Sequence, residues 1–127
     1  RLVLTPANET LWNHSGEYSL EARKWTLTPL RPTIAYSLMR AARPRVGGLL
    51  VDPMCGCGTV GELGVAEEDI FAISGDLDQV AVDAAGANAA KKGRIDVVRW
   101  DATRLPLRAG CVDMVVTDAP FGKRCEG

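Results

Sequence analysis

The segment VDPMCGCGTVGE, residues 51–62, determines which fold we expect for this sequence. It overlaps the end of an apolar run, GLLVD (48–52), which predicts a buried parallel strand. Gly56, Gly58 and Gly61 then match the pattern G-x-G-x-x-G, and the following residues favour a helix as far as about Val65. A strand, a glycine-rich turn and a helix in this order indicate the start of an open α/β sheet.

Apolar runs and helical periodicity alternate along the rest of the chain. The expected strands are 69–76, 95–100 and 112–118, and the expected helices are 31–42 and 79–93. A weaker strand is expected around Trp25 to Leu27, within an otherwise irregular segment 1–28. The alternation predicts an α/β fold, in which flanking helices cover an open and mostly parallel sheet.

Local signals set the expected helix boundaries. Pro32 suits the first turn of the helix at 31–42. Gly93 is expected to stop the helix at 79–93, with Lys91 and Lys92 in its last turn, where cations complement the helix dipole.

Length and composition limit the class of protein. The chain has 127 residues, 46% of them hydrophobic, and a net charge of −1, which is typical of one globular domain rather than a disordered chain. No apolar run approaches the roughly 20 residues needed to cross a bilayer. The chain starts at Arg1 and stops directly after a motif-like run, so we expect a fragment of a longer protein.

The cysteines favour neither a disulfide framework nor a zinc site. Their spacing forms no paired C-x-x-C, and the single His14 leaves no plausible ligand set, so we expect no metal. We expect reduced thiols in a protein of the cytoplasm or nucleus. The four cysteines are Cys55, Cys57, Cys111 and Cys125.

Charge is distributed unevenly. Residues 62–83 carry seven acidic groups and no basic one, whereas basic residues predominate in the flanking segments. A nucleic-acid partner is compatible with these flanks, but ordinary solvated faces explain the charges equally well.

Four carboxylates fall at or just after the ends of the expected strands. Because the carboxyl ends of parallel strands share one edge of a sheet, this series favours a ligand site there. These residues are Asp52, Asp76, Asp101 and Asp118.

The glycine turn does not fit the common phosphate-binding motifs well. It lacks the G-K-[ST] of a P-loop, and the carboxylate of Asp52 would repel a pyrophosphate but attract a cation. The turn at 118–122, DAPFG, has no role in binding nicotinamide. These features disfavour a dinucleotide-dependent dehydrogenase.

The motifs together carry a family resemblance. DPMCGCGT (52–59) resembles motif I of S-adenosylmethionine-dependent methyltransferases, and three later segments resemble their second, third and fourth motifs: GDLD (75–78), WDATRLPL (100–107) and TDAPFG (117–122). With LTPLRPTIAYSLMRAA upstream and VDMVVTDAPFGKR at the end, residues 23–125 resemble the THUMP-domain tRNA guanine-N2 methyltransferases.

The resemblance implies a Rossmann-like class I methyltransferase fold, truncated before its last strands. Residues 29–127 would form a partial S-adenosylmethionine-dependent domain, and residues 1–28 would lead from an N-terminal THUMP domain that binds RNA. The implied partners are tRNA and a small zinc-binding activator subunit.

The resemblance also implies how the cofactor is bound. The first motif would line the methionine and ribose, Asp76 would accept the ribose hydroxyls, and Asp101 with the amide of Ala102 would contact the adenine. Asp78 would be a second ribose partner or simply a helix cap. The implied cofactor-binding residues are Asp52, Pro53, Gly56, Gly58, Thr59, Asp76, Asp78, Asp101 and Ala102.

The fourth motif would carry the chemistry through Asp118, Pro120 and Phe121. Asp118 and the turn carbonyls would accept the N–H groups of the guanine N2 amine, Pro120 would fix the turn, and Phe121 would stack on the base. Each motif has a plainer interpretation, namely a tight connection without ligand and a loop with a buried Phe. Glu62 lies one residue short of the family's usual acidic position and is not assigned a role.

Two other functions remain open from the sequence. The fourth motif also permits methylation of another exocyclic amine, such as N6 of adenine, in RNA or DNA. A scaffold that binds the cofactor without catalysis is the second alternative. Lys123 and Arg124 would contact the phosphates of an RNA substrate, or be ordinary surface charges.

Overall fold

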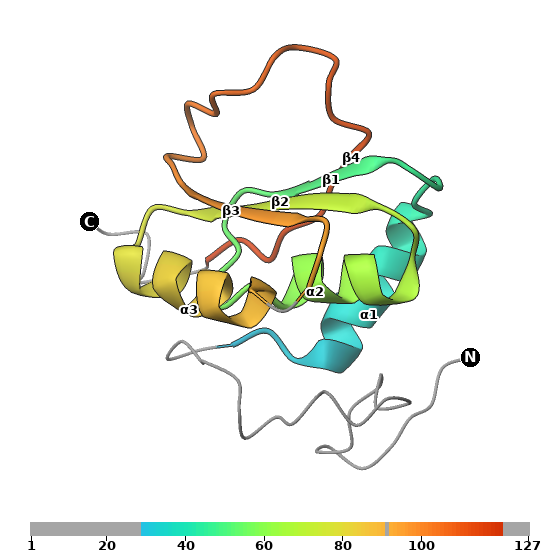
Figure 1. Cartoon of the computed structure of the whole chain (residues 1–127), viewed down its shortest axis with the longest axis horizontal. Coiled ribbons are helices and arrows are strands. Elements are labelled where there is room, and N and C mark those ends of the chain that lie inside the picture. Colours follow the sequence, from blue (N-terminus) through green and yellow to red (C-terminus); the bar gives the residue numbers. More distant parts are fainter. Residues whose placement is uncertain (1–28, 91, 121–127) are drawn as a thin grey trace.

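The computed structural model describes residues 29–90 and 92–120 and shows a four-stranded parallel sheet with three helices (Figure 1). The helices lie together on one face of the sheet, and the loop from β3 to β4 rises on the opposite side. The elements, in chain order, are α1 (Pro32–Ala42), β1 (Leu49–Asp52), α2 (Thr59–Glu67), β2 (Phe71–Asp76), α3 (Gln79–Ala89), β3 (Ile95–Arg99) and β4 (Met114–Val115). The predicted α/β fold is confirmed. Among the described residues, no helix combines the length and apolarity needed to span a membrane.

The strand order β3-β2-β1-β4 places a topological switch beside β1. The chain moves outward from β1 through β2 to β3, and then returns to the other side of β1 as β4. In open α/β sheets, ligands bind beyond the carboxyl ends of the strands at such a switch. The topology therefore directs attention to the ends of β1 and β4.

Small residues allow α2 to pack closely against the sheet. A Cβ on Gly61 would meet Ser74 Oγ at 2.4 Å, and a Cβ on Gly64 would meet the side chain of Ile70 at 3.0 Å. The buried apolar cluster fills the space between the sheet and the first two helices, with Met39 and Leu50 among its members. The third glycine of the G-x-G-x-x-G pattern thus serves helix–sheet packing.

The predicted start of α1 agrees with the structure, whereas the predicted end of α3 does not. Helix α1 begins at Pro32, as predicted. Helix α3 ends at Ala89 rather than near Gly93, because the chain turns there and the N–H of Lys92 donates to the carbonyl of Ala89 at 2.8 Å. Arg94, with φ of 72°, adopts the left-handed conformation after this turn, whereas Gly93, which was expected to stop the helix, does not.

Strand β4 is shorter than the predicted 112–118. Its ladder with β1 is extended by single backbone bonds, from Asp113 N to Leu49 O and from Val116 N to Val51 O, each 3.1 Å. At the start of the pair, the carboxylate of Asp113 accepts the N–H of Leu49 at 2.7 Å. A side chain thereby replaces the next ladder bond, which ends the regular pairing. The weaker strand expected near Trp25 lies outside the described residues.

Candidate functional site

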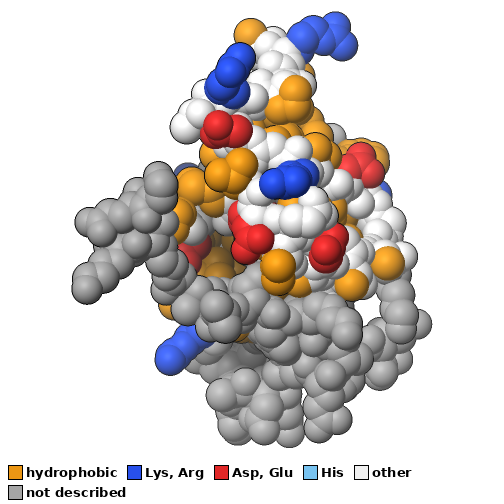
Figure 2. All heavy atoms as spheres, turned by 90° about the vertical axis from the view of Figure 1, so that its left-hand side faces the viewer, with side chains coloured by type: hydrophobic (Ala, Val, Ile, Leu, Met, Phe, Trp, Pro, Cys, Tyr) orange, Lys and Arg blue, Asp and Glu red, His pale blue; other side chains and the backbone are white. Residues whose placement is uncertain are grey.

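Three of the four strand-end carboxylates lie near one another at the carboxyl edge of the sheet. Asp52 and Asp76 are the last residues of β1 and β2, and Asp118 follows β4. Their mutual influence is electrostatic, since the charges of Asp76 and Asp118 both act on the carboxyl of Asp52. Figure 2 shows this side of the molecule, where several acidic and basic side chains lie on the part of the face that is described.

Asp52 is a buried carboxylate in an acidic environment. It is 2% exposed, and its Oδ1 accepts a 3.3 Å hydrogen bond from the N–H of Met54. Burial raises the pKa of Asp52 to about 6, the charges of Asp76 and Asp118 act in the same direction, and Thr117 and Met54 oppose them. The ion pairs found among the described residues do not involve Asp52. A cationic ligand would therefore stabilise its ionised form.

The glycine turn is held in place by Asp76. The N–H of Gly56 donates to Asp76 Oδ2 at 2.9 Å, while Asp76 Oδ1 accepts the N–H of Asp78 at 3.0 Å. Each carboxylate oxygen has further lone-pair capacity, so the predicted bonds to ribose hydroxyls remain chemically compatible with these two bonds. The structure adds a second role that the sequence did not indicate, namely fixing the turn.

The second glycine of the turn is required by its backbone. Gly58 has a φ of +88°, and a Cβ there would lie 3.2 Å from the Cβ of Ala85 on α3. Asn88, also on α3, donates from Nδ2 to the carbonyl of Cys57 at 2.9 Å. Helix α3 therefore packs against the turn and orients its backbone. The sequence analysis missed Asn88, which has no distinguishing pattern around it.

The thiols of the turn are packing groups. Cys55 and Cys57 are buried, and they and Cys111 are free among the described cysteines. Burial, reinforced by Asp52 and Asp76, raises the pKa of the Cys55 thiol and keeps it protonated.

Asp78 is a helix cap. Its Oδ1 accepts the N–H of Val80 at 3.0 Å at the start of α3, which confirms the plainer of its two predicted roles. A contact with ribose remains a prediction.

Asp101 lies exposed on the loop after β3 and organises that loop locally. Its Oδ1 accepts hydrogen bonds from the N–H of Thr103 at 2.9 Å and from its hydroxyl at 2.7 Å. These bonds lower the pKa of Asp101. The proposed contacts of Asp101 and Ala102 with adenine stay predictions. Among the described residues, the hydrogen bonds of the Asp101 carboxylate go to Thr103 and not to the three clustered carboxylates.

The sequence analysis also missed Trp100, which directly precedes Asp101. The indole is buried, and its Nε1 donates to the carbonyl of Pro53 at 3.1 Å. A glycine inside a strand often marks a close approach, and Gly75 next to Asp76 was the available signal. Trp100 covers that glycine.

Glu62 is buried in the first turn of α2. It is 3% exposed, and burial raises its pKa to about 8, with the charge of Lys92 acting in the opposite direction. Its carboxyl group is therefore mainly protonated at neutral pH. This behaviour could not be derived from its position in the motif.

The acceptor turn is described only as far as Pro120. Asp118 and Pro120 are both exposed. The remaining predicted residues of this region, Phe121, Lys123 and Arg124, lie outside the described residues.

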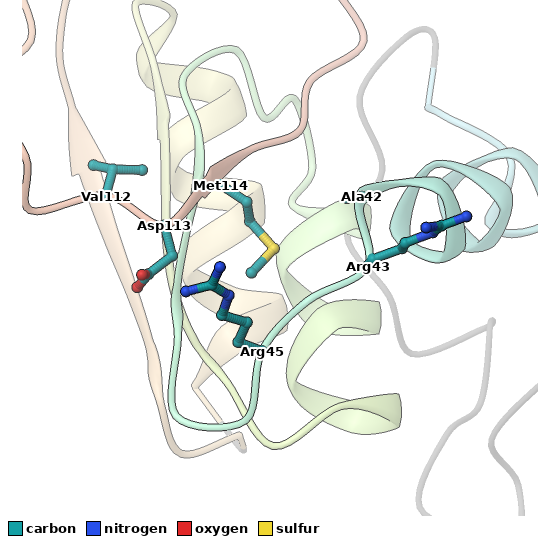
Figure 3. A pocket seen from close by; sticks show the side chains of 6 residues that line it. All are labelled: Ala42, Arg43, Arg45, Val112, Asp113 and Met114. Carbon is teal, nitrogen blue, oxygen red and sulfur yellow. The ribbon is translucent and has the colours of Figure 1, made fainter.

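A separate pocket of about 370 Å³ lies where β1 and β4 begin, at the opposite end of the strands from Asp52 (Figure 3). In this view Arg45 points toward Met114 and Asp113, whereas Arg43 points away from them. It is not part of the carboxylate site. The lining residues are Ala42, Arg43, Arg45, Val112, Asp113 and Met114. Within residues 29–90 and 92–120, no cluster of three or more His, Cys, Asp or Glu is suited to a metal ion.

Comparison with known proteins identifies relatives of this domain. The human tRNA (guanine(6)-N(2))-methyltransferase THUMP3 is 44% identical over 112 residues, which cover 76% of this chain and 22% of that protein. The mouse U6 snRNA (guanine-N(2))-methyltransferase THUMPD2 is 36% identical over 100 residues, covering 75% and 19%. The chain thus spans about a fifth of the length of these curated relatives.

Solved structures show the same fold. TrmN from Thermus thermophilus has a TM-score of 0.65 and 29% identity, covering 79% of this chain and 31% of that one. A putative RNA methyltransferase, PH1948 from Pyrococcus horikoshii, has a TM-score of 0.68 and 22% identity, covering 82% and 58%. The family model described as RMKL-like, methyltransferase domain, matches residues 22–127. The resemblance seen in the four motifs is confirmed, and the chain belongs to the RMKL-like methyltransferase domain family.

Proposed function

We propose that this domain transfers a methyl group from S-adenosylmethionine to the exocyclic N2 of a guanosine in tRNA. The observation that carries the proposal is the buried carboxylate of Asp52, placed with Asp76 and Asp118 beside the glycine turn at the switch of strand order. The names of the guanine-N2 methyltransferases among the relatives support the reaction and the type of substrate.

The residues at this edge fit the chemistry of the donor. S-adenosylmethionine supplies an electrophilic methyl group on a sulfonium and also carries an ammonium. Carboxylates favour both positive charges, whereas the first-turn amides of α2 favour a carboxylate at the other end of the amino acid tail. Asp52 and the glycine turn would hold this tail, and Asp76 would accept the ribose hydroxyls.

Asp118 would activate the acceptor. The lone pair of the guanine N2 amine is delocalised into the ring, so the amine is a weak nucleophile. The Asp118 carboxylate would accept a hydrogen bond from one N–H of this amine. It would thereby orient the amine toward the methyl group and stabilise the positive charge that develops on nitrogen. The amine proton then leaves to Asp118 or to water, which restores the neutral base.

Exposed arginines on the loop after β3 support an RNA substrate. Arg104 and Arg108 lie on the loop after β3, and neither takes part in the ion pairs found among the described residues. Guanidinium groups in this position would contact backbone phosphates while the base enters the acidic edge. Phe121, in this proposal, stacks on the base.

Partners of the whole protein are part of the same proposal. A THUMP domain would bind the RNA, a small zinc-binding subunit would act as activator, and the protein would work in the cytoplasm or nucleus. The relatives' greater length leaves room for an RNA-binding domain in the complete protein.

A methyl-transfer assay on several acceptors tests the proposal. The protein is incubated with labelled donor and with tRNA, U6 snRNA, ribosomal RNA or DNA, alone and together with a candidate activator subunit. We expect transfer to tRNA, and its loss in Asp118→Ala with donor binding retained. Transfer to adenine in DNA or RNA would favour the alternative enzyme, and donor binding without any transfer would favour the scaffold.

A further inference from the structure

Trp100 forms hydrogen bonds both with the end of β2 and with the turn that follows β1. Its backbone N–H donates to the carbonyl of Asp76 at 3.1 Å, and its indole Nε1 donates to the carbonyl of Pro53 at 3.1 Å. The residue is 6% exposed and directly follows β3. One side chain therefore connects the end of β3 with the turn after β1, although β2 lies between these strands.

The indole can cross β2 only because residue 75 is glycine. A Cβ on Gly75 would meet Cε2 of Trp100 at 2.1 Å and Nε1 at 2.2 Å, much closer than non-bonded atoms approach. The backbone of Gly75 is not in the left-handed region, so the glycine supplies space and not conformational freedom. Its carbonyl also accepts the N–H of Cys55 at 2.8 Å, which attaches the glycine turn to the same point of β2.

This contact lies away from the main apolar core. Ser74 faces α2, so the adjacent Gly75 faces the opposite side of the sheet, where none of the described helices lies. The core that joins the helices to the sheet is built around residues such as Leu50 and Leu63. The indole of Trp100 instead forms its hydrogen bond with the carbonyl of Pro53, directly after Asp52.

We propose that Trp100 is a positioning residue, which fixes the Asp52–Pro53 turn relative to Asp101 and thereby sets the distance between the two ends of the donor site. The inference rests on the proposed donor, which would extend from the glycine turn to the loop at Asp101. Without the indole N–H, the Pro53 carbonyl loses its partner and the turn is free to shift. Donor binding would then be weaker, because part of its free energy would be needed to order this turn.

Trp100→Phe tests this role, because it keeps an aromatic ring over β2 and removes the N–H. We expect the dissociation constant for S-adenosylmethionine, measured by calorimetry on the protein, to rise about fivefold, as the loss of one hydrogen bond implies. The kcat at saturating donor should change less than twofold. Ile70→Val, in the buried core just before β2, is the matched control: it should lower the melting temperature similarly and leave the dissociation constant unchanged.

A second variant checks the contact itself. Gly75→Ala should weaken donor binding in the wild-type background and much less in Trp100→Ala, since no ring lies over residue 75 in that background. An unchanged dissociation constant in Trp100→Phe, with a melting temperature lowered as in the control, would overturn the inference while leaving the proposed function intact. Conversely, donor binding with methyl transfer to an acceptor other than guanine would refute the proposed substrate and leave the role of Trp100 standing. A wild-type protein that binds no donor would refute both.

Discussion

Replacing Asp52 with Asn should make the protein more stable and a poorer binder of its donor. The substitution keeps the size of the side chain and the acceptor for the Met54 N–H, but removes a buried charge. Burial raises the pKa of Asp52 from 3.8 to about 6. The folded state therefore binds the proton more strongly than the unfolded state, and the associated stability is complete below pH 3.8 and is lost as the pH rises through 6.

The shift in pKa sets the size of the effect. A change of about 2 units corresponds to about 3 kcal/mol, so the ionised carboxylate destabilises the unliganded fold by about this amount at pH 7. A bound cation that restores an ordinary pKa recovers the same free energy, which corresponds to roughly a hundredfold in affinity. Asp52→Asn gives up this gain.

Two measurements at pH 7 check both halves of the prediction. Urea unfolding should show Asp52→Asn more stable than the wild type, with the difference shrinking toward pH 4, and calorimetry should show weaker binding of S-adenosylmethionine. Asp96→Asn is the control, because it removes an equal charge from an exposed position on β3. A less stable Asp52→Asn variant that binds the donor as well as the wild type would refute the reasoning.

Three further variants test the site and its surroundings. Glu62→Gln should reduce the loss of stability that the wild type shows as the pH rises from about 4.5 to 8, because burial raises the pKa of Glu62 from 4.5 to about 8 and the unfolded state releases its proton before the folded state does. Gly58→Ala should cost about 1–2 kcal/mol in urea unfolding, because φ of +88° is strained for any residue with a Cβ. Arg104→Ala combined with Arg108→Ala should weaken tRNA binding and reduce the slope of log affinity against log salt by about 1.5, as the loss of two phosphate contacts implies.

Each of these variants has a control or a contradicting outcome. Parallel stability profiles of Glu62→Gln and wild type from about pH 4.5 to 8 would contradict the role given to its burial. Gly86→Ala, on α3 with open space around its Cβ position, should be neutral or stabilising by about 0.5–1 kcal/mol. Arg43→Ala with Arg45→Ala removes two charges from the opposite end of the strands and should leave tRNA affinity unchanged. An equal loss in both arginine pairs would mean that only net charge matters.

The sequence allowed the fold to be predicted wherever local chemistry decides the structure. Pro32 marks the start of α1 because its ring suits the first helical turn, and Asp52 and Asp76 end their strands as expected. The predicted end of α3 was wrong. Arg94, and not Gly93, adopts the left-handed conformation, and local propensity does not predict which of the two residues does so. The start of β4 was not predictable from local sequence, because the carboxylate of Asp113 accepts a hydrogen bond from Leu49, which is 64 positions away.

The candidate site was predictable in its residues but not in their contacts. Motif spacing placed the carboxylates at one edge, since parallel strands share their carboxyl ends. It did not show that Asp76 bonds the turn through Gly56, nor that Trp100 reaches Pro53 across a neighbouring strand. These contacts join residues 20 and 47 positions apart, and only the three-dimensional packing of β1, β2 and β3 brings them together.

The position of the transferred methyl group tests the central claim most directly. The protein is incubated with S-adenosylmethionine bearing a deuterated methyl group and with a tRNA that lacks modifications, and the RNA is digested to nucleosides for mass spectrometry. The account predicts deuterated N2-methylguanosine, which disappears when Asp118 is replaced with Ala. Label found only in N6-methyladenosine, or N2-methylguanosine formed equally well by the Asp118→Ala variant, would contradict it.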